Sequence, residues 1–144
     1  MNTPDFPAIA AVLSERLEAH LRVCQAIYFL ASEENQALSD EGEYSAYDFH
    51  QRRKTLLPQL QQSLESLIQD RPAWQQLAPS ERARCPEIHT RLRLAQDLIM
   101  KAIIMDRENE QALLRRGLVP ARHWPSPART RPHYVTELYR RNLA

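Results

Sequence analysis

The sequence predicts an all-α protein: an antiparallel bundle of three long helices followed by an irregular Pro- and Arg-rich C-terminal extension. Two observations predict this class. Apolar residues recur at every third or fourth position through three long segments, and the 144-residue chain has only two glycines. Short connections favour antiparallel neighbours, so we expect the first and third helices to run in the same direction. We assign residues 1–118 to the helical domain and residues 119–144 to a basic tail with a short recognition helix.

The first predicted helix covers residues 7–38. Pro7 suits a first helical position, and two neighbouring apolar stripes give this helix a wide buried face. One stripe consists of Leu17, Leu21, Cys24, Tyr28, Ala31, Asn35 and Leu38, and the other of Ile9, Leu13, Val23, Ile27 and Leu30. We expect Gly42 to supply the turn that follows.

The second predicted helix covers residues 45–69 and carries a leucine-rich stripe. Pro58 lies inside it, so we expect a kink there. Residues 70–81 contain two prolines, and we expect them to form a connection with one helical turn around Trp74 and Leu77.

The third predicted helix begins near Pro86, or one turn earlier with Ser80 as its cap, and ends at Arg116. Gly117 directly follows it, a strong stop signal. Its apolar stripe consists of Ile88, Leu92, Ala95, Ile99 and Ala102, and then reaches Asp106 and Asn109 before Leu113 restores it.

All three helices break their apolar stripes near the same end of the bundle. The breaks are Glu34 and Asn35, Arg53, and Asp106 with Asn109. They indicate either a shared polar network, which would leave a groove mouth for a partner helix, or helix ends that splay into solvent. We expect Arg53 to lie within about 20 Å of Asn109.

Composition and charge exclude several classes of function. The chain is 43% hydrophobic and 26% charged, with a net charge of +1, so the body of the protein should not attract nucleic acid or anionic lipid. We find no signal peptide and no apolar run long enough to span a membrane. Two cysteines without a CxxC motif suit a reducing compartment, and we expect a cytoplasmic protein.

No motif in the sequence predicts catalysis, a cofactor or a metal. Paired Glu-x-x-His motifs for a dinuclear metal site are absent. His20 and Cys24 are four residues apart, but two ligands do not make a site, and we expect a packed cysteine beside a half-exposed histidine. Phosphate loops, dinucleotide fingerprints and nucleophile elbows are also missing.

Three alternatives remain open at this stage. Arg22, Arg53 and Lys54 could bind an acidic metabolite in a small helical enzyme. The tail could stack on single-stranded nucleic acid through its aromatic residues, although its prolines and the neutral body argue against this. The bundle could also be a structural interaction protein that forms a homodimer.

Three segments resemble flagellar export chaperones of the FlgN type: LASEENQAL (30–38), QRRKTLLPQLQQSL (51–64) and DRENEQALLRRGL (106–118). The resemblance implies a non-catalytic cytoplasmic chaperone that holds hook–filament junction proteins by their C-terminal helices and delivers them to the type III export gate. The positions that match are Glu34, Arg53, Lys54, Asn109, Leu113 and Leu114. The tail sequence WPSPARTRPHYVTELYRRN does not match the family pattern.

The tail supplies the remaining candidate contacts with a protein partner. These are Leu118, Trp124, Tyr134, Leu138 and Tyr139. Tyr134 and Leu138 are four residues apart, so a short helix over residues 134–143 would present them together. Our hypothesis is that this segment recognises a partner and that Arg140 and Arg141 meet acidic groups there.

Overall fold

The computed structural model describes residues 5–40 and 43–117, which contain four helices and no strand. They are α1 (Phe6–Ser39), α2 (Ala46–Gln75), α3 (Pro79–Arg82) and α4 (Pro86–Arg115). The all-α class is confirmed for this part of the chain. Three helices are long, as expected, and α3 is an additional short one.

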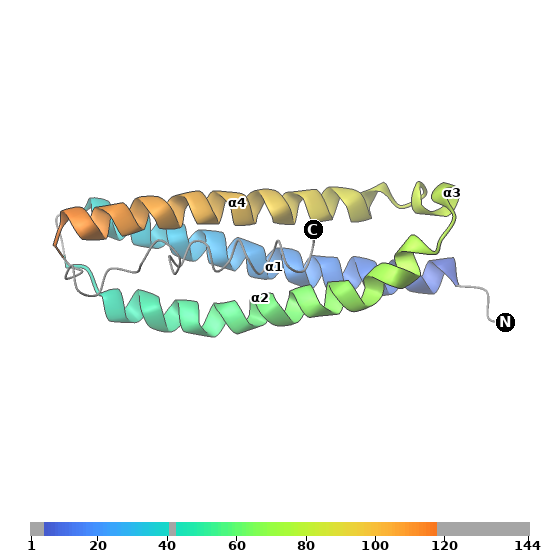
Figure 1. Cartoon of the computed structure of the whole chain (residues 1–144), viewed down its shortest axis with the longest axis horizontal. Coiled ribbons are helices and arrows are strands. Elements are labelled where there is room, and N and C mark those ends of the chain that lie inside the picture. Colours follow the sequence, from blue (N-terminus) through green and yellow to red (C-terminus); the bar gives the residue numbers. More distant parts are fainter. Residues whose placement is uncertain (1–4, 41–42, 118–144) are drawn as a thin grey trace.

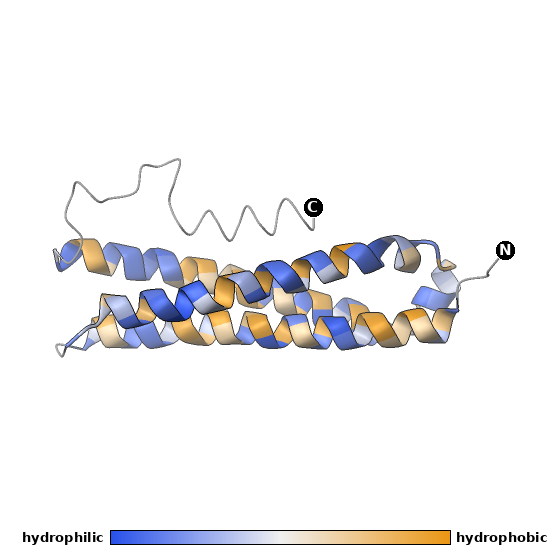
Figure 2. Ribbon diagram, turned by 90° about the horizontal axis from the view of Figure 1, so that it is seen from below, coloured by the Kyte–Doolittle hydropathy of each residue, from blue (hydrophilic) through white to orange (hydrophobic). Residues whose placement is uncertain are grey.

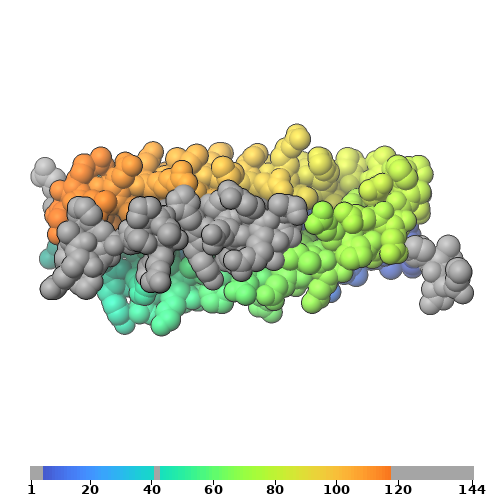
Figure 3. All heavy atoms as spheres, viewed as in Figure 1, coloured from blue at the N-terminus to red at the C-terminus, as the bar shows by residue number. Residues whose placement is uncertain are grey.

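The molecule is elongated (Figures 1 and 3), and α1 is its central helix (Figure 1). In Figure 1, α1 lies behind and between α4 and α2. α1 and α4 run in the same direction, and α2, which comes between them in the sequence, runs in the opposite direction. α1 packs along both α2 and α4, whereas α2 and α4 do not pack along each other in this way. One side of the α2–α4 pair therefore faces away from α1.

The second helix is longer than the sequence predicted. We expected it to end at residue 69, but α2 continues through Pro58 and Pro72 to Gln75. A proline inside a helix costs about 3 kcal/mol, and burial of one large apolar side chain returns about 1.5–3 kcal/mol. Trp74 packs against the apolar cluster formed by α1, α2 and α4, and Leu77 directly after the helix is 3% exposed. Tertiary burial thus outweighs the local signal of the prolines.

The other helix ends follow their local signals. Pro7 lies in the first turn of α1, and α4 begins at Pro86. The Ser45 hydroxyl accepts a hydrogen bond from the Asp48 backbone N–H at 3.3 Å and caps α2. Gly117 has a φ of 67°, a left-handed conformation that suits glycine at a helix stop. Ser80 does not cap α4, because it belongs to the separate helix α3.

The buried core follows the predicted apolar stripes and forms two clusters along the molecule. Figure 2 shows hydrophobic and hydrophilic residues alternating along each long helix. The cluster in the middle consists of Cys24, Ile27, Leu60, Leu64, Ala95, Ile99, Ala102 and Ile103. The cluster near the start of α1 consists of Ala10, Leu13, Leu17, Leu67 and Ile88. Each cluster draws side chains from α1, α2 and α4, so the three long helices are packed together at two levels of the molecule.

His20 is part of this interior, and our expectation that it is half-exposed was wrong. Its side chain is fully buried, with Nδ1 2.7 Å from the Ser63 hydroxyl on α2 and Nε2 3.5 Å from the Cys24 sulfur. The Ser63 hydroxyl gives the imidazole a hydrogen-bond partner inside the core, so His20 can be buried. The sequence alone does not show this partner, because Ser63 belongs to another helix. Burial lowers the pKa of His20 from 6.5 to about 4.

This pKa predicts that the contribution of His20 to stability falls in mild acid. The unfolded chain protonates His20 below pH 6.5, while the folded protein does so only near pH 4, so stability falls as pH drops through this window. The loss approaches about 3 kcal/mol. Urea unfolding at pH 7 and at pH 4 should show that His20→Gln gains stability relative to the wild type as the pH falls. His89→Gln, on an exposed α4 position, is the control and should leave the pH dependence unchanged; a similar effect of both variants would contradict this assignment.

Candidate functional site

Six polar side chains meet where α1 and α4 end and α2 begins. We call them the polar cluster, and they are Glu34, Asn35, Tyr44, Arg53, Asp106 and Asn109. They come from α1, the connection after it, α2 and α4. Helix direction explains the meeting, since the last turns of α1 and α4 lie beside the first turns of α2 (Figure 1).

Glu34 is the centre of the polar cluster. Its side chain is 1% exposed and pairs with the guanidinium of Arg53 on α2, which is 25% exposed. The Tyr44 hydroxyl donates a second hydrogen bond to Glu34 at 2.6 Å. A buried carboxylate survives only when it is paired and hydrogen-bonded, and here two partners from outside α1 meet that requirement.

Asn109 joins α4 to α1 in the same region and is also 1% exposed. Its Nδ2 donates to the Ala31 carbonyl at 2.9 Å, and its Oδ1 accepts from Asn35 Nδ2 at 3.0 Å. A buried amide left without these bonds would cost about 1–3 kcal/mol. The bonds therefore favour one alignment of α4 against α1.

Burial displaces the titration of Asp106 and Tyr44 in the polar cluster. Burial is the main reason that the pKa of Asp106 rises from 3.8 to about 6; Arg53 opposes the rise, and Glu34 and Glu110 add to it. Burial, followed by the bond to Glu34, raises the pKa of Tyr44. The phenol therefore stays protonated at neutral pH and acts as a donor to Glu34.

The structure confirms that the polar breaks of the three long helices meet. Arg53 contacts Glu34, and Asn109 contacts the neighbouring Asn35, which agrees with the predicted proximity of Arg53 and Asn109. The alternative of splayed, solvated helix ends was wrong for Glu34 and Asn109, because both are buried. Sequence periodicity could not decide this, since a polar residue on a buried face has the same spacing whether or not it finds a partner.

The other candidate contacts have different surroundings. Lys54 is exposed, while Leu113 and Leu114 are half-buried. Leu118 and the tail residues Trp124, Tyr134, Leu138 and Tyr139 lie outside the described residues. Their role as contacts to a partner stays a prediction.

Sequence reasoning missed two groups at this end of the molecule. Tyr44 lies in the connection before α2, where no periodic pattern marks it. Arg116 Nη1 donates to the Leu38 carbonyl at 3.4 Å and so binds the last turn of α1. A basic residue in the final turn of a helix was a usable signal, since such side chains often bind free carbonyls there.

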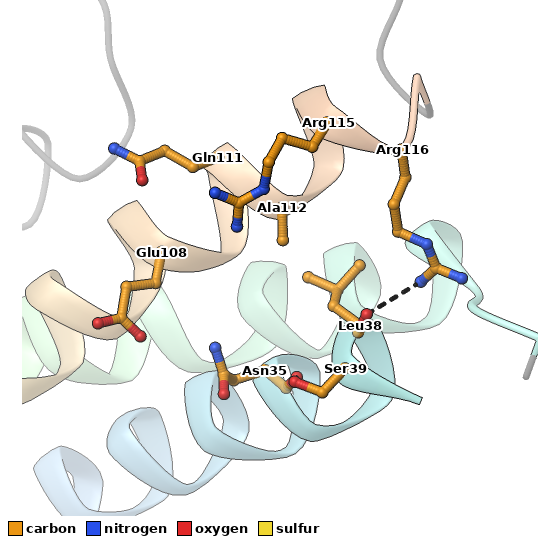
Figure 4. A pocket seen from close by; sticks show the side chains of 8 residues that line it. All are labelled: Asn35, Leu38, Ser39, Glu108, Gln111, Ala112, Arg115 and Arg116. Carbon is orange, nitrogen blue, oxygen red and sulfur yellow. Dashed lines mark hydrogen bonds between the residues drawn. The ribbon is translucent and has the colours of Figure 1, made fainter. Parts of the chain in front are cut away.

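A shallow hollow of about 430 Å³ lies beside the polar cluster, on the outer side of the α1–α4 contact (Figure 4). Its lining consists of Asn35, Leu38, Ser39, Glu108, Gln111, Ala112, Arg115 and Arg116. In Figure 4, side chains of α4 face the last turn of α1 across it. Most of these side chains are polar and of both charges, which does not define one ligand.

The described residues contain no group of three or more His, Cys, Asp or Glu that could hold a metal ion. The arginine-rich arrangement considered for an acidic metabolite does not form there either: Arg22 and Lys54 are exposed, and Glu34 already neutralises Arg53. None of the helices in residues 5–40 and 43–117 combines the length and apolarity of a membrane span.

Comparisons of the chain with protein-family models, with curated proteins and with solved structures find no match.

The Glu34–Arg53 pair gives a first test of the polar cluster. Arg53→Met leaves a buried carboxylate without its cation and should lower the free energy of unfolding by about 3 kcal/mol. The double variant Glu34→Leu with Arg53→Met removes both charges and should recover most of that loss. Urea unfolding at pH 7 measures both, with Arg52→Met as the control, because the Arg52–Glu33 pair is exposed. Equal losses in the Arg52 and Arg53 variants would contradict a buried pair.

Asp106 gives a second test, with a pH dependence of opposite sign to that of His20. Burial favours the protonated carboxyl of Asp106. Its contribution to the free energy of unfolding is therefore fully present below pH 3.8 and is lost as the pH rises through about 6. Asp106→Asn should therefore raise the free energy of unfolding by about 1–3 kcal/mol at pH 7 and change it little at pH 4. Asp97→Asn, on an exposed position of α4, is the control. A gain for Asp106→Asn that is as large at pH 4 would refute the shifted titration.

Proposed function

We propose that the protein is a non-catalytic cytoplasmic export chaperone or adaptor of the FlgN type. It binds the helical C-terminal segments of flagellar hook–filament junction proteins. In this proposal the three long helices act as one antiparallel bundle to which the client adds a further helix. The resemblance of residues 30–38, 51–64 and 106–118 to that family supports the client class.

One structural observation carries the proposal: large apolar side chains are exposed along the long helices. They are Val12, Phe29, Tyr47, Leu94, Met100 and Ile104, and three of the six belong to α4. Met100 and Ile104 are 55% and 54% exposed and lie one turn apart. Exposed apolar side chains at helical spacing match the requirement of a surface that binds an amphipathic helix.

The polar cluster supports the same proposal from inside the molecule. A chaperone has to keep its own helices aligned while it is empty, and buried polar contacts such as Glu34–Arg53 and Asn109–Ala31 serve this purpose. Asn109 is buried and is directed inwards by its bond to the Ala31 carbonyl, so it does not make the end of α4 more polar towards solvent.

The tail completes the proposed client site. Its candidate contacts are Trp124, Tyr134, Leu138 and Tyr139, and burial of each would contribute about 1.5–3 kcal/mol. From Arg115 to the C-terminus there are seven arginines and one acidic residue, so this part of the chain favours an acidic binding partner.

Removal of the tail tests the proposal. The two apolar clusters take side chains from α1, α2 and α4, so we expect a chain that ends at Gly117 to melt within about 3 °C of the full chain. The same truncation should abolish binding of a hook–filament junction C-terminal segment from the same genome, measured by titration calorimetry. The full chain is the positive control. Failure of the full chain to bind any such segment would defeat the proposed function, and unfolding of the truncated chain would show that the tail belongs to the core.

A homodimeric interaction protein is the second candidate, favoured by one observation on α1. Phe29 is 64% exposed and lies nine residues after His20, which faces α2. Nine residues are about two and a half turns, so Phe29 projects from the opposite side of α1. Light scattering separates the two candidates: a concentration-dependent dimer that Phe29→Ser abolishes would favour the second.

A further inference from the structure

The side of α4 that faces away from the core carries a strip of side chains arranged symmetrically about Ala102. Ala102 is 1% exposed and belongs to the apolar cluster in the middle of the molecule. Residues two, five, nine or twelve positions before and after it are turned away from it by about 120–180° on a helix. We call these residues the α4 strip: Thr90, Arg93, Asp97, Met100, Ile104, Arg107, Gln111 and Leu114. All of them are exposed except Leu114, which is half-buried.

The α4 strip has the spacing of a surface that pairs with another helix. Its members are alternately three and four residues apart, which keeps one line of a helix against a partner helix. At its centre, Met100 and Ile104 are 55% and 54% exposed. From Thr90 to Leu114 the strip is about 36 Å long, so a second helix can lie along most of α4.

Opposite charges lie on the two sides of this apolar centre. Asp97 precedes Met100 by about one turn, and Arg107 follows Ile104 by about one turn. Both charged residues are exposed, and neither belongs to an ion pair found within residues 5–40 and 43–117. A helix that pairs with the strip should therefore offer a cation opposite Asp97 and an anion opposite Arg107.

We propose that the α4 strip binds the same strip of a second copy of this chain, with the two α4 helices antiparallel and a twofold axis beside Ala102. Such an axis brings each residue opposite the one that lies equally far from Ala102 on the other chain. Met100 then meets Ile104 of the second copy, and Asp97 meets Arg107 of the second copy. The interface has an apolar centre of four side chains with an ion pair on each side of it.

Charge distinguishes this occupant from the others that the chain could supply. In parallel pairing each residue faces its own copy, so Asp97 meets a second Asp97 and Arg107 a second Arg107, which opposes association. Residues 115–144 contain seven arginines and one acidic residue, so they match Asp97 but not Arg107. A second copy in antiparallel orientation matches both charges.

The dimer goes beyond the proposed function and does not depend on it. It also differs from the second candidate above, whose contact is Phe29 on α1. Met100 and Ile104 are among the side chains assigned to client binding, so a client helix and a second copy would compete for them. Pairing of two copies would cover these apolar side chains while no client is bound, which opposes aggregation.

Apolar variants with matched controls test the position of the contact. Sedimentation equilibrium of the full chain should show a reversible dimer. Met100→Ser and Ile104→Ser should each raise its dissociation constant at least about tenfold, because each change acts twice at the centre of the interface. Leu94→Ser is the matched control, since Leu94 is 49% exposed on α4 but lies about 100° from the middle of the strip. Phe29→Ser is the control on α1. A full chain that stays monomeric at every concentration, or equal losses in the controls, would overturn the proposal.

Single charge reversals test the antiparallel pairing. Asp97→Arg places two cations at each charged contact and Arg107→Asp places two anions there, so each variant should dimerise at least about tenfold more weakly than the wild type. In parallel pairing, a single reversal would exchange one like-charge contact for another and change little. Lys101→Glu, on an exposed position outside the strip, is the charge control. Circular dichroism checks the fold, and a wild-type dissociation constant in both reversed variants would refute antiparallel pairing.

A mixture of the two reversed variants restores the complementary charges. In a mixed dimer the Asp97→Arg chain presents cations at both positions and the Arg107→Asp chain presents anions, so both contacts are attractive again. Energy transfer between differently labelled chains should show the mixture associating with about the affinity of the wild type. A mixture that associates no more tightly than either variant alone would contradict the proposed contacts.

The dimer and the proposed function fail separately. If a hook–filament junction segment binds the full chain but the chain alone is monomeric at every concentration, the dimer is wrong and the proposed function stands. If the dimer forms as predicted and no junction segment binds, the proposed function is wrong and the dimer stands.

Discussion

The buried pairing of Glu34 with Arg53 is the constraint on which the alignment of the helices depends. Leucine-rich stripes tolerate sliding, because one apolar contact can replace another at modest cost. A carboxylate that is 1% exposed has no such tolerance: a shift of α2 by one residue turns Arg53 by about 100° and removes its counterion. Asn109 imposes the same condition between α4 and α1 through the Ala31 carbonyl. Apolar burial thus supplies most of the stability, and these polar contacts select the register.

Features governed by local chemistry could be predicted from the sequence. Pro86 begins a helix and Gly117 ends one for reasons contained in a few neighbouring residues, and the meeting of Glu34, Arg53 and Asn109 follows from helix direction alone. The extension of α2 beyond Pro72 could not be predicted, because it depends on side chains that Trp74 meets from other helices. Tyr44 was missed for the same reason: only the folded chain brings its hydroxyl to Glu34.

His20 and Asp106 show that burial acts on titration in opposite directions. Desolvation opposes the charged form of each group, so it lowers the pKa of the histidine to about 4 and raises that of the aspartate to about 6. As pH falls between these values, the histidine contribution destabilises the fold while the aspartate contribution stabilises it. The two largely offset each other, so the wild-type protein should hide an acid response that the single variants reveal.

The inner polar contacts also direct the exposed side chains beside them. Adjacent residues on a helix point about 100° apart, so fixing Arg53 against Glu34 fixes the direction of Lys54, and holding Asn109 against the Ala31 carbonyl fixes which side of α4 faces outwards. The directions of these exposed side chains are then set by the buried contacts. A client would meet a preformed surface, which reduces the entropy lost on binding. The residues that interrupt the apolar stripe of α4 therefore connect the register of the fold to the surface of the proposed chaperone.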